Sequence, residues 1–158
     1  MLGGSAEYTG APFYAAQAAL RVGADSAHVF APEEAVIPIK SYSPELVVHA
    51  WQSKAGFIRD NLSVANSFVL GPGLGRSESA LALFQNALNE LVMIEKDKNV
   101  VLDADALWWL KEKRALVIMC SYYSNSGKNI ILTPNVIEFK RLWDTYFPKD
   151  EVQPATLE

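Results

Sequence analysis

The strongest constraint on the fold is a repeated alternation of short apolar runs with longer helical patterns. Apolar runs of strand length occur at residues 27–30, 45–49, 67–70, 99–102, 117–119 and 129–132. Helical periodicity separates them, at residues 12–22, 32–40, 77–95, 106–113 and 136–146. A chain that repeats strand, loop and helix builds βαβ units around a mostly parallel sheet. The sequence therefore predicts an α/β fold, while residues 51–65 fit either a helix or a loop.

Three of these helices carry signals for their ends or their buried faces. Gly23 is placed as the C-terminal stop of the first helix, and Ser77 as the N-cap of the third. Pro38 is expected to interrupt the second helix. The spacing predicts that the first helix buries Ala15, Ala18, Ala19 and Val22, and that the third buries Ala80, Leu81, Phe84, Ala87, Leu88, Leu91 and Val92.

Length and composition are those of one globular domain with a core of its own. The chain has 158 residues, of which 50% are hydrophobic and 20% are charged. The residues after Tyr146 become polar. We therefore expect one domain over residues 1–147 and a polar tail over residues 148–158.

Charge and cysteine content exclude several classes of protein. The formal net charge is -4 and the cations are scattered, so we expect no nucleic-acid partner. No run approaches the ~18 apolar residues of a membrane helix, so we expect no membrane partner. A single cysteine, Cys120, fits a small core residue in a reducing compartment, and neither His28 nor His49 has a companion at zinc-ligand spacing.

Three polar loops follow strands of the expected sheet, at residues 71–76, 103–105 and 133–138. In open parallel sheets, ligands collect at the carboxyl ends of the strands. These loops are therefore the places where a site is expected, together with the glycine-rich opening at residues 3–12.

Each loop has a structural interpretation beside the functional one. The spacing Gly-x-Gly-x-Gly at residues 71–75 suits either an anion-binding loop or a tight strand-to-helix turn, and Arg76 could hold an anion. Asp103 and Asp105 could hold magnesium or orient a hydroxyl, or Asp105 could cap the following helix. Asn135 and Glu138 form either a capping box or part of a phosphate–magnesium site.

Five strings, in this order, resemble the NAD(P)H-hydrate dehydratase family. They are Gly-Gly-Ser-Ala-Glu-Tyr-Thr-Gly-Ala-Pro at 3–12, Ser-Pro-Glu-Leu at 43–46, Gly-Pro-Gly-Leu-Gly-Arg at 71–76, Leu-Asp-Ala-Asp-Ala-Leu at 102–107 and Leu-Thr-Pro-Asn-Val-Ile-Glu-Phe at 132–139. The resemblance reaches from the start of the chain to about residue 142, and Asn135 is similar to the eukaryotic branch.

The resemblance implies a ribokinase-like fold, a three-layer α/β/α arrangement that is incomplete here. It implies dehydration of the S form of hydrated NADH or NADPH, with ATP or ADP as co-substrate and Mg²⁺. The substrate contacts that it implies are Tyr8, Thr9, Gly73, Gly75, Asn135, Val136, Ile137, Glu138, Phe139, Lys140 and Arg141. Asp103, Asp105 and Glu138 would line the metal and phosphate region.

Members of that family extend beyond both ends of this chain. They hold ATP with a Lys-Gly-x-x-Asp segment and a Gly-Ser-Gly-Asp segment, and the second supplies the catalytic Asp. Neither segment occurs here, so we expect the catalytic Asp to lie beyond the C-terminus and this chain to be inactive alone. A compartment in the cytoplasm, or the mitochondrion, is expected.

Two other functions fit the same residues. One is a small-metabolite kinase of the ribokinase superfamily. The other is a non-catalytic chain that pairs with a full-length relative. A parallel sheet with an open apolar edge also suggests a homo-oligomer.

Overall fold

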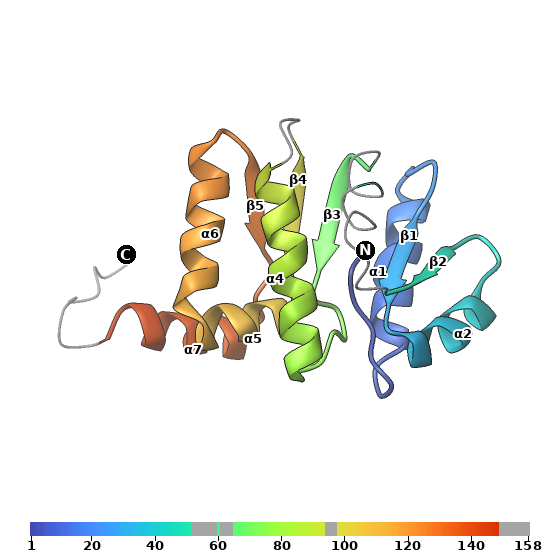
Figure 1. Cartoon of the computed structure of the whole chain (residues 1–158), viewed down its shortest axis with the longest axis horizontal. Coiled ribbons are helices and arrows are strands. Elements are labelled where there is room, and N and C mark those ends of the chain that lie inside the picture. Colours follow the sequence, from blue (N-terminus) through green and yellow to red (C-terminus); the bar gives the residue numbers. More distant parts are fainter. Residues whose placement is uncertain (52–59, 61–64, 94–97, 149–158) are drawn as a thin grey trace.

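The structure is a parallel sheet with helices on both of its faces (Figure 1). It is a computed structural model that describes residues 1–51, 60, 65–93 and 98–148. The described strands are β1 His28–Ala31, β2 Val47–Ala50, β3 Ser67–Leu70, β4 Asn99–Leu102 and β5 Asn129–Leu132. The described helices are α1 Gly10–Arg21, α2 Glu33–Tyr42, α4 Glu78–Met93, α5 Asp105–Glu112, α6 Arg114–Asn125 and α7 Val136–Tyr146.

Parallel pairing joins the strands in two groups, which a single residue connects. β1 pairs with β2, and β4 pairs with both β3 and β5, in parallel throughout. Leu2 forms parallel bridges to Phe30 of β1 and to Leu70 of β3. The order across the sheet is therefore β2, β1, Leu2, β3, β4, β5, and all the loops that follow strands open on one edge.

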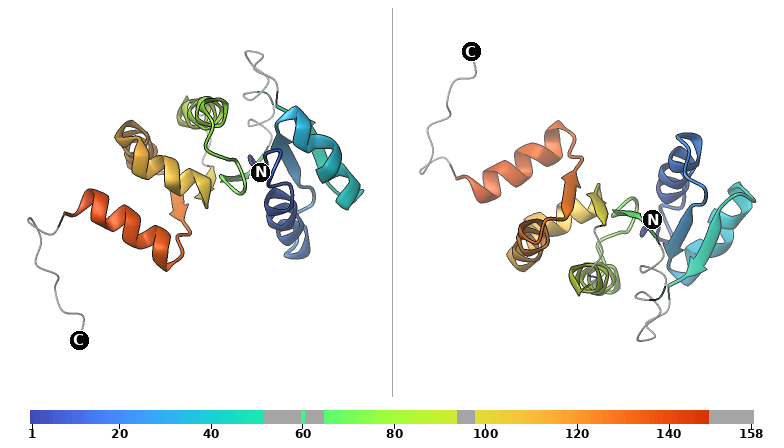
Figure 2. Two further views of the ribbon diagram at one scale, coloured as in Figure 1. Left: turned by 90° about the horizontal axis from the view of Figure 1, so that it is seen from below. Right: turned by 90° about the horizontal axis from the view of Figure 1, so that it is seen from above.

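The helices form layers on the two sides of this sheet. α4 and α6 lie side by side on one face, and α1 lies on the opposite face (Figure 2). The larger core cluster fills the space between the β3–β5 strands and α4, α5 and α6, with Phe84, Leu102 and Leu116 fully buried. A smaller cluster packs α1 and α2 against β1 and β2, around Val29 and Ile39. The expected α/β class and layered arrangement are confirmed.

One expected strand is wrong. Residues 117–119 lie inside α6, which buries Leu116 and Tyr123 at a spacing of two helical turns. A three-residue apolar run fits a strand or a buried helix face equally well. The packing of α6 against α4 and β5 decides for the helix.

The ends of the helices follow the sequence signals, whereas one buried face does not. Gly23 takes a φ of 107° just after α1, and the Oγ of Ser77 accepts the Ala80 N–H at 3.2 Å. The expected face of α4 is buried, with Val92 partly so. α1 instead buries Pro12 and Ala16, and its expected face is wrong because alanines stand on several sides of this helix and cannot distinguish them.

α2 continues through Pro38 to Tyr42 without interruption. Pro38 is the sixth residue of α2 and has no N–H, so the helix lacks the one hydrogen bond that residue 38 would donate to the Glu34 carbonyl and continues without it. Of the ambiguous residues 51–65, only 51, 60 and 65 are described, and residues 149–158 of the expected tail also lie outside the described part. Among the described residues, no helix combines the length and apolar character needed to cross a bilayer.

Candidate functional site

The glycine loop after β3 lies in close contact with two other segments. Gly71 has a φ of 119°, and a Cβ there would stand 1.9 Å from the carbonyl oxygen of Asp103. Gly73 has a φ of 65°, and its Cβ would stand 2.7 Å from the carbonyl oxygen of Tyr8. Only glycine combines these backbone angles with this approach. The loop therefore joins the opening segment to the loop after β4.

Asp105 organises the glycine loop rather than capping a helix. Its Oδ2 accepts the Gly75 N–H at 2.9 Å, and its Oδ1 pairs with Nε of Arg76 at 3.3 Å. Helix α5 begins at Asp105, after Ala104, and makes no side-chain cap. The interpretation of Asp105 as an N-cap is therefore wrong, because its carboxylate is directed across the sheet edge to the loop at Gly75.

Asp103 lies at the same edge with a different partner. Its Oδ1 accepts the hydroxyl of Thr133 at 2.8 Å, which links the loops after β4 and β5. Ala104, between the two aspartates, has a φ of 49°. A positive φ is uncommon for a residue other than glycine. The described residues contain no cluster of three possible metal ligands, so magnesium binding by Asp103, Asp105 and Glu138 stays a prediction.

α7 begins with a complete capping box. Oδ1 of Asn135 accepts the N–H groups of Ile137 and Glu138, each at 3.0 Å. Oε2 of Glu138 accepts the Asn135 N–H at 2.9 Å. The structural interpretation of this pair is confirmed. The box fixes the direction in which α7 leaves the sheet edge, and so positions Arg141 one turn further on.

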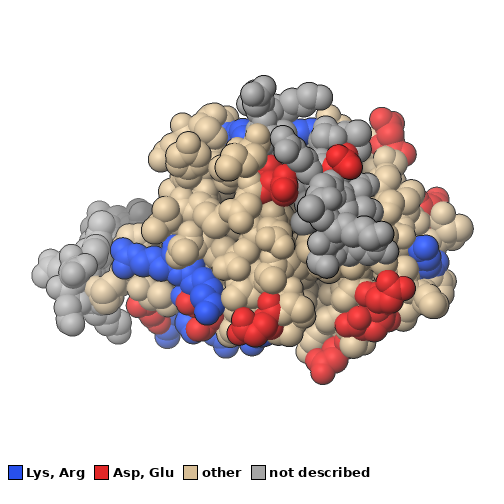
Figure 3. Space-filling view, in the orientation of Figure 1, with Lys and Arg blue, Asp and Glu red and all other residues tan. Residues whose placement is uncertain are grey.

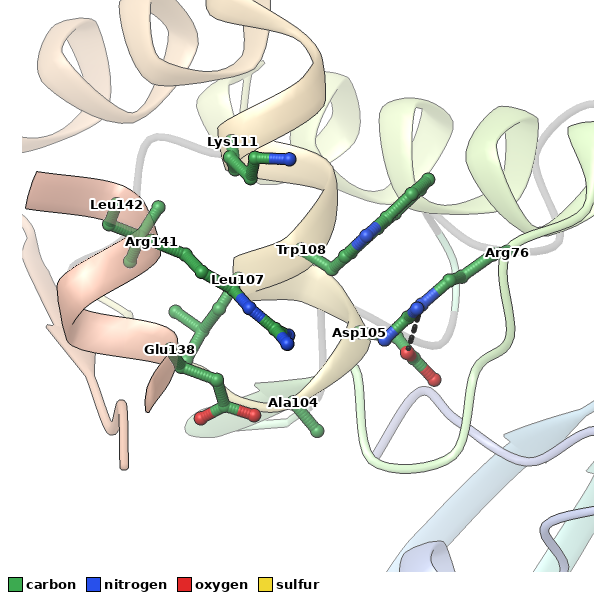
Figure 4. A pocket seen from close by; sticks show the side chains of 9 residues that line it. All are labelled: Arg76, Ala104, Asp105, Leu107, Trp108, Lys111, Glu138, Arg141 and Leu142. Carbon is green, nitrogen blue, oxygen red and sulfur yellow. Dashed lines mark hydrogen bonds and ion pairs between the residues drawn. The ribbon is translucent and has the colours of Figure 1, made fainter. Parts of the chain in front are cut away.

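A small cavity of about 70 Å³ lies between α5, α7 and the start of α4 (Figure 4). Three cations line it, Arg76, Lys111 and Arg141, and the Arg76 guanidinium stacks 4.8 Å from the Trp108 ring. Asp105 and Glu138 complete its polar wall. A concave site with this excess of positive charge suits an anion such as a phosphate group.

The charges in this cavity are not equally available to a ligand. Arg76 pairs with Asp105, and Lys111 pairs with Glu112 at 2.6 Å. The guanidinium of Arg141 points into the cavity and pairs with no carboxylate among the described residues (Figure 4). On the face shown in Figure 3, Lys and Arg side chains gather over the end of the molecule that carries α5 and α7.

The structure brings some of the expected contact residues together and separates others. Tyr8 and Gly73 are adjacent, Gly75 meets Asp105, and Glu138 and Arg141 line the cavity. Thr9 instead hydrogen-bonds Tyr42, with 2.6 Å between the hydroxyl oxygens. The remaining residues of the α7 stretch are exposed, with exposed fractions of 85% for Val136, 64% for Ile137 and 52% for Phe139.

Two cavity residues, Trp108 and Lys111, were not expected from the sequence. They lie about one and two turns into α5. From the sequence, a tryptophan there predicts a core residue and a lysine predicts a solvated helix end. The signal that could have found them is their spacing from Asp105. Positions three apart on a helix are neighbours, so Asp105, Trp108 and Lys111 form a continuous stripe along α5.

Cys120 has no part in this site. Burial raises the pKa of its thiol to about 11, so the thiol stays protonated and weakly nucleophilic near neutral pH. It lies in α6, partly buried against the larger core cluster.

Comparison with known proteins agrees with the resemblance. The family model described as NAD(P)H-hydrate dehydratase matches residues 1–156. An ATP-dependent (S)-NAD(P)H-hydrate dehydratase of Entamoeba histolytica is 42% identical over 147 residues, which are 91% of this chain and 46% of that protein. The chain thus spans less than half the length of this relative.

Two solved structures share the fold. A ribokinase-like superfamily protein of Enterococcus faecalis matches with a TM-score of 0.67 at 20% identity, over 89% of this chain and 46% of that one. The ADP/ATP-dependent NAD(P)H-hydrate dehydratase of Bacillus subtilis, co-crystallised with ATP/Mg²⁺, matches with a TM-score of 0.56 at 26% identity, over 89% and 46%. The fold is ribokinase-like, and the chain belongs to the NAD(P)H-hydrate dehydratase family.

Proposed function

We propose that this chain binds hydrated NADH or NADPH at the sheet edge and forms the substrate side of an ATP- or ADP-dependent dehydratase. The observation that carries the proposal is the cavity that Arg141 of α7 and Arg76 of the glycine loop both line. The substrate is a dinucleotide with phosphate groups. The guanidinium of Arg141, which pairs with no carboxylate in the described part of the chain, lines one cavity with a residue of the glycine loop and is suited to bind such a group.

The chemistry requires the hydroxyl of the hydrated ring to leave. Hydroxide is a poor leaving group, and transfer of the terminal phosphoryl group of ATP or ADP to this oxygen makes it a good one. The lone pair of the ring nitrogen then expels phosphate, and loss of a ring proton restores the double bond. In phosphoryl transfer, the protein contributes mainly position and charge neutralisation.

The residues of this chain contribute to positioning rather than to the chemical step. Asp105 fixes the Gly75 N–H and the Arg76 side chain, and the capping box fixes α7. These contacts hold the two arginines at opposite sides of one small cavity. The catalytic Asp of the family would come from a segment that this sequence does not contain.

Mg²⁺ fits these residues poorly as they stand. Both carboxylate oxygens of Asp105 and Oε2 of Glu138 already accept hydrogen bonds or pair with Arg76. The magnesium that we propose as cofactor would therefore rely on the phosphates of the nucleotide for most of its ligands.

Binding of hydrated NADPH to the purified chain tests the proposal. We expect titration with hydrated NADPH to change the fluorescence of Trp108, which stands beside Arg76. Arg141→Gln removes the available cation and should weaken binding by about tenfold or more, the usual loss for a charged hydrogen-bond partner.

Arg21→Gln is the matched control, because Arg21 ends α1 far from the cavity and is exposed. This variant should bind as the unchanged chain does. Equal binding by Arg141→Gln and Arg21→Gln, or no binding by the folded chain, would overturn the proposed role of the cavity.

A further inference from the structure

The two backbone groups of Gly75 are both held by the first turns of α5. The Gly75 N–H donates to Oδ2 of Asp105 at 2.9 Å, and the Gly75 carbonyl accepts the Nε1–H of Trp109 at 3.2 Å. Asp105 and Trp109 stand four positions apart on α5, so their side chains lie on the same face of that helix. One face of α5 therefore holds both the amide and the carbonyl of this glycine.

Trp109 is a core residue whose polar atom reaches the glycine loop. Its exposed fraction is 3%, and it packs in the larger core cluster. The neighbouring Trp108 ring lies edge-on to it, with 4.6 Å between the ring centroids and an angle of 79° between the rings. A buried indole N–H can only donate, and it needs an acceptor. The Gly75 carbonyl is that acceptor, and the packing of the ring fixes where the donor stands.

Gly75 depends on these hydrogen bonds more than Gly71 and Gly73 of the same loop do. A Cβ added at Gly71 or Gly73 would stand 1.9 Å or 2.7 Å from the nearest atom, so close packing restrains both residues. At Gly75, the nearest atom belongs to Ser5 and stands 3.6 Å away, an ordinary contact distance. Gly75 has a φ of 84°, and a glycine that packing does not restrain has many other conformations open to it. The hydrogen bonds to α5 therefore select its conformation.

The Trp109 hydrogen bond also sets the orientation of the peptide group that joins Gly75 to Arg76. In the described part of the chain no peptide bond is cis, so the Gly75 carbonyl and the Arg76 N–H point in opposite directions. With the carbonyl directed to Trp109, the Arg76 N–H is directed away from that ring. No acceptor among the described residues takes this N–H, which leaves it available to a ligand.

The side chain of Arg76 is held by the same helix. Its Nε pairs with Oδ1 of Asp105 at 3.3 Å, and its guanidinium stacks over the Trp108 ring (Figure 4). α5 thus holds the Gly75 backbone through Trp109 and the Arg76 side chain through Trp108. A cavity wall that is held in this way loses little conformational freedom when a ligand binds, which favours affinity.

We infer that Trp109 is a positioning residue for the dinucleotide. Its indole N–H fixes the Gly75 peptide group and, through it, the wall of the cavity that Arg76 forms. In the described structure Trp109 does not itself line this cavity, so it acts through these two residues. The inference rests on the proposed function, because it concerns how the same site is held in shape.

The test removes the indole N–H and compares the result with the loss of a similar hydrogen bond elsewhere. Trp109→Phe keeps an aromatic ring in the core, and Tyr123→Phe is the matched control. Tyr123 is 2% exposed in the same core cluster, and its hydroxyl donates to the Lys98 carbonyl at 2.9 Å, outside the cavity. Calorimetry measures the binding of hydrated NADPH, and hydrogen exchange is followed at the Gly75 amide. Both are measured at a temperature at which circular dichroism shows every chain to be folded.

We expect Trp109→Phe to weaken binding by about five- to tenfold and to speed exchange of the Gly75 amide by a similar factor, the usual effect of one lost hydrogen bond. Tyr123→Phe should change neither, although both variants should unfold at a lower temperature. Because phenylalanine is smaller than tryptophan, a second variant carries benzothienylalanine at position 109, where sulfur replaces the N–H in a ring of nearly the same size. This variant should behave as Trp109→Phe does.

The outcomes separate this inference from the proposed function. If the parent chain binds and both replacements at position 109 bind equally well, the inference is overturned and the proposed function stands. An equal loss of binding in Tyr123→Phe also overturns the inference, because the loss would then reflect stability alone. So does weaker binding by Trp109→Phe with the benzothienylalanine variant unchanged, because ring volume would then be the cause. A folded parent chain that does not bind hydrated NADPH overturns both.

Discussion

At the scale of single residues, Ala104 holds a conformation that its side chain disfavours. Its φ is 49° and its ψ is -113°, and the Ala106 N–H donates to the carbonyl of Asp103 at 3.1 Å around it. This is the turn geometry in which glycine is preferred. The turn directs the two carboxylates to different loops. Asp103 accepts the hydroxyl of Thr133 after β5, and Asp105 accepts the Gly75 N–H after β3.

Ala104→Gly should therefore stabilise the fold. Relief of the positive φ outweighs the greater freedom that glycine gives the unfolded chain, for a gain of about 1 kcal/mol. Urea unfolding of the variant and the parent chain measures the difference. Ala106→Gly, in the first turn of α5, serves as control and should destabilise, so a loss in both variants would contradict the assigned strain.

The Met1 amino group makes stability depend on pH. Its pKa is 8.0 in the unfolded chain and about 5 in the folded one, because burial disfavours the charge. The unfolded state then binds more protons between pH 5 and pH 8. The free energy of unfolding should fall as the pH is lowered through this window, by up to about 1.4 kcal/mol per pH unit.

Urea unfolding at pH 8.0, 7.5 and 7.0 measures this slope, with the N-acetylated chain as control. Burial, and then the charges of His28 and Lys40, also lower the pKa of His49. Protonation of His49 therefore also reduces the free energy of unfolding, but at lower pH than that of the amine. The range above pH 7 therefore isolates the amine. If the N-acetylated chain shows the same slope above pH 7, burial of the Met1 amino group is not the cause of the slope.

At the scale of elements, the capping box of α7 stabilises the start of the helix whether or not its residues bind a substrate. α7 buries no residue completely, so packing contributes little to its start and the cap contributes much. The same Asn135 and Glu138 were expected to contact the substrate. Their backbone hydrogen bonds are a sufficient reason for their identity in this chain.

Asn135→Ala should cost about 1 kcal/mol of stability, whereas Asn135→Asp should keep most of the cap. Both predictions are checked by thermal unfolding, in which 1 kcal/mol corresponds to a shift of about 2–4 °C for a chain of this size. If the two variants are equally unstable, the side-chain oxygen is not the stabilising group.

At the scale of the whole molecule, β5 forms the edge of the sheet, and in the described part of the chain it pairs on one side only, with β4. Ile131 and Leu132 of β5 are 52% and 44% exposed, and Phe139 and Trp143 of α7 are 52% and 43% exposed. Leu132, Phe139 and Trp143 line a groove of about 720 Å³ between α6 and α7. An exposed strand edge beside an apolar helix face is prone to pair with another chain.

We therefore expect this chain to self-associate or to unfold at low denaturant concentration. Sedimentation at increasing protein concentration measures the first, and urea unfolding the second. Ile131→Lys places a charge on the open edge and should shift the chain toward the monomer. A stable monomer with a high unfolding midpoint would contradict this expectation.

The same chain should not restore reduced nicotinamide from hydrated NADH with ATP and magnesium. The sequence contains neither the Lys-Gly-x-x-Asp nor the Gly-Ser-Gly-Asp segment of the family. Absorbance of reduced nicotinamide measures the reaction, and a full-length relative is the positive control. Restored absorbance would show that another segment supplies the catalytic group.

The sequence by itself determined the family, the positions of the site loops and the order of strands and helices apart from residues 117–119. It could do so because period, glycine spacing and caps are local properties of the chain. Tertiary structure decided that residues 117–119 are helical and that α1 buries Pro12 and Ala16, since burial depends on neighbours that are distant in sequence. It also decided that Asp105 holds the glycine loop and that Trp108, Lys111 and Arg141 share one cavity, because those contacts join segments about 30 residues apart.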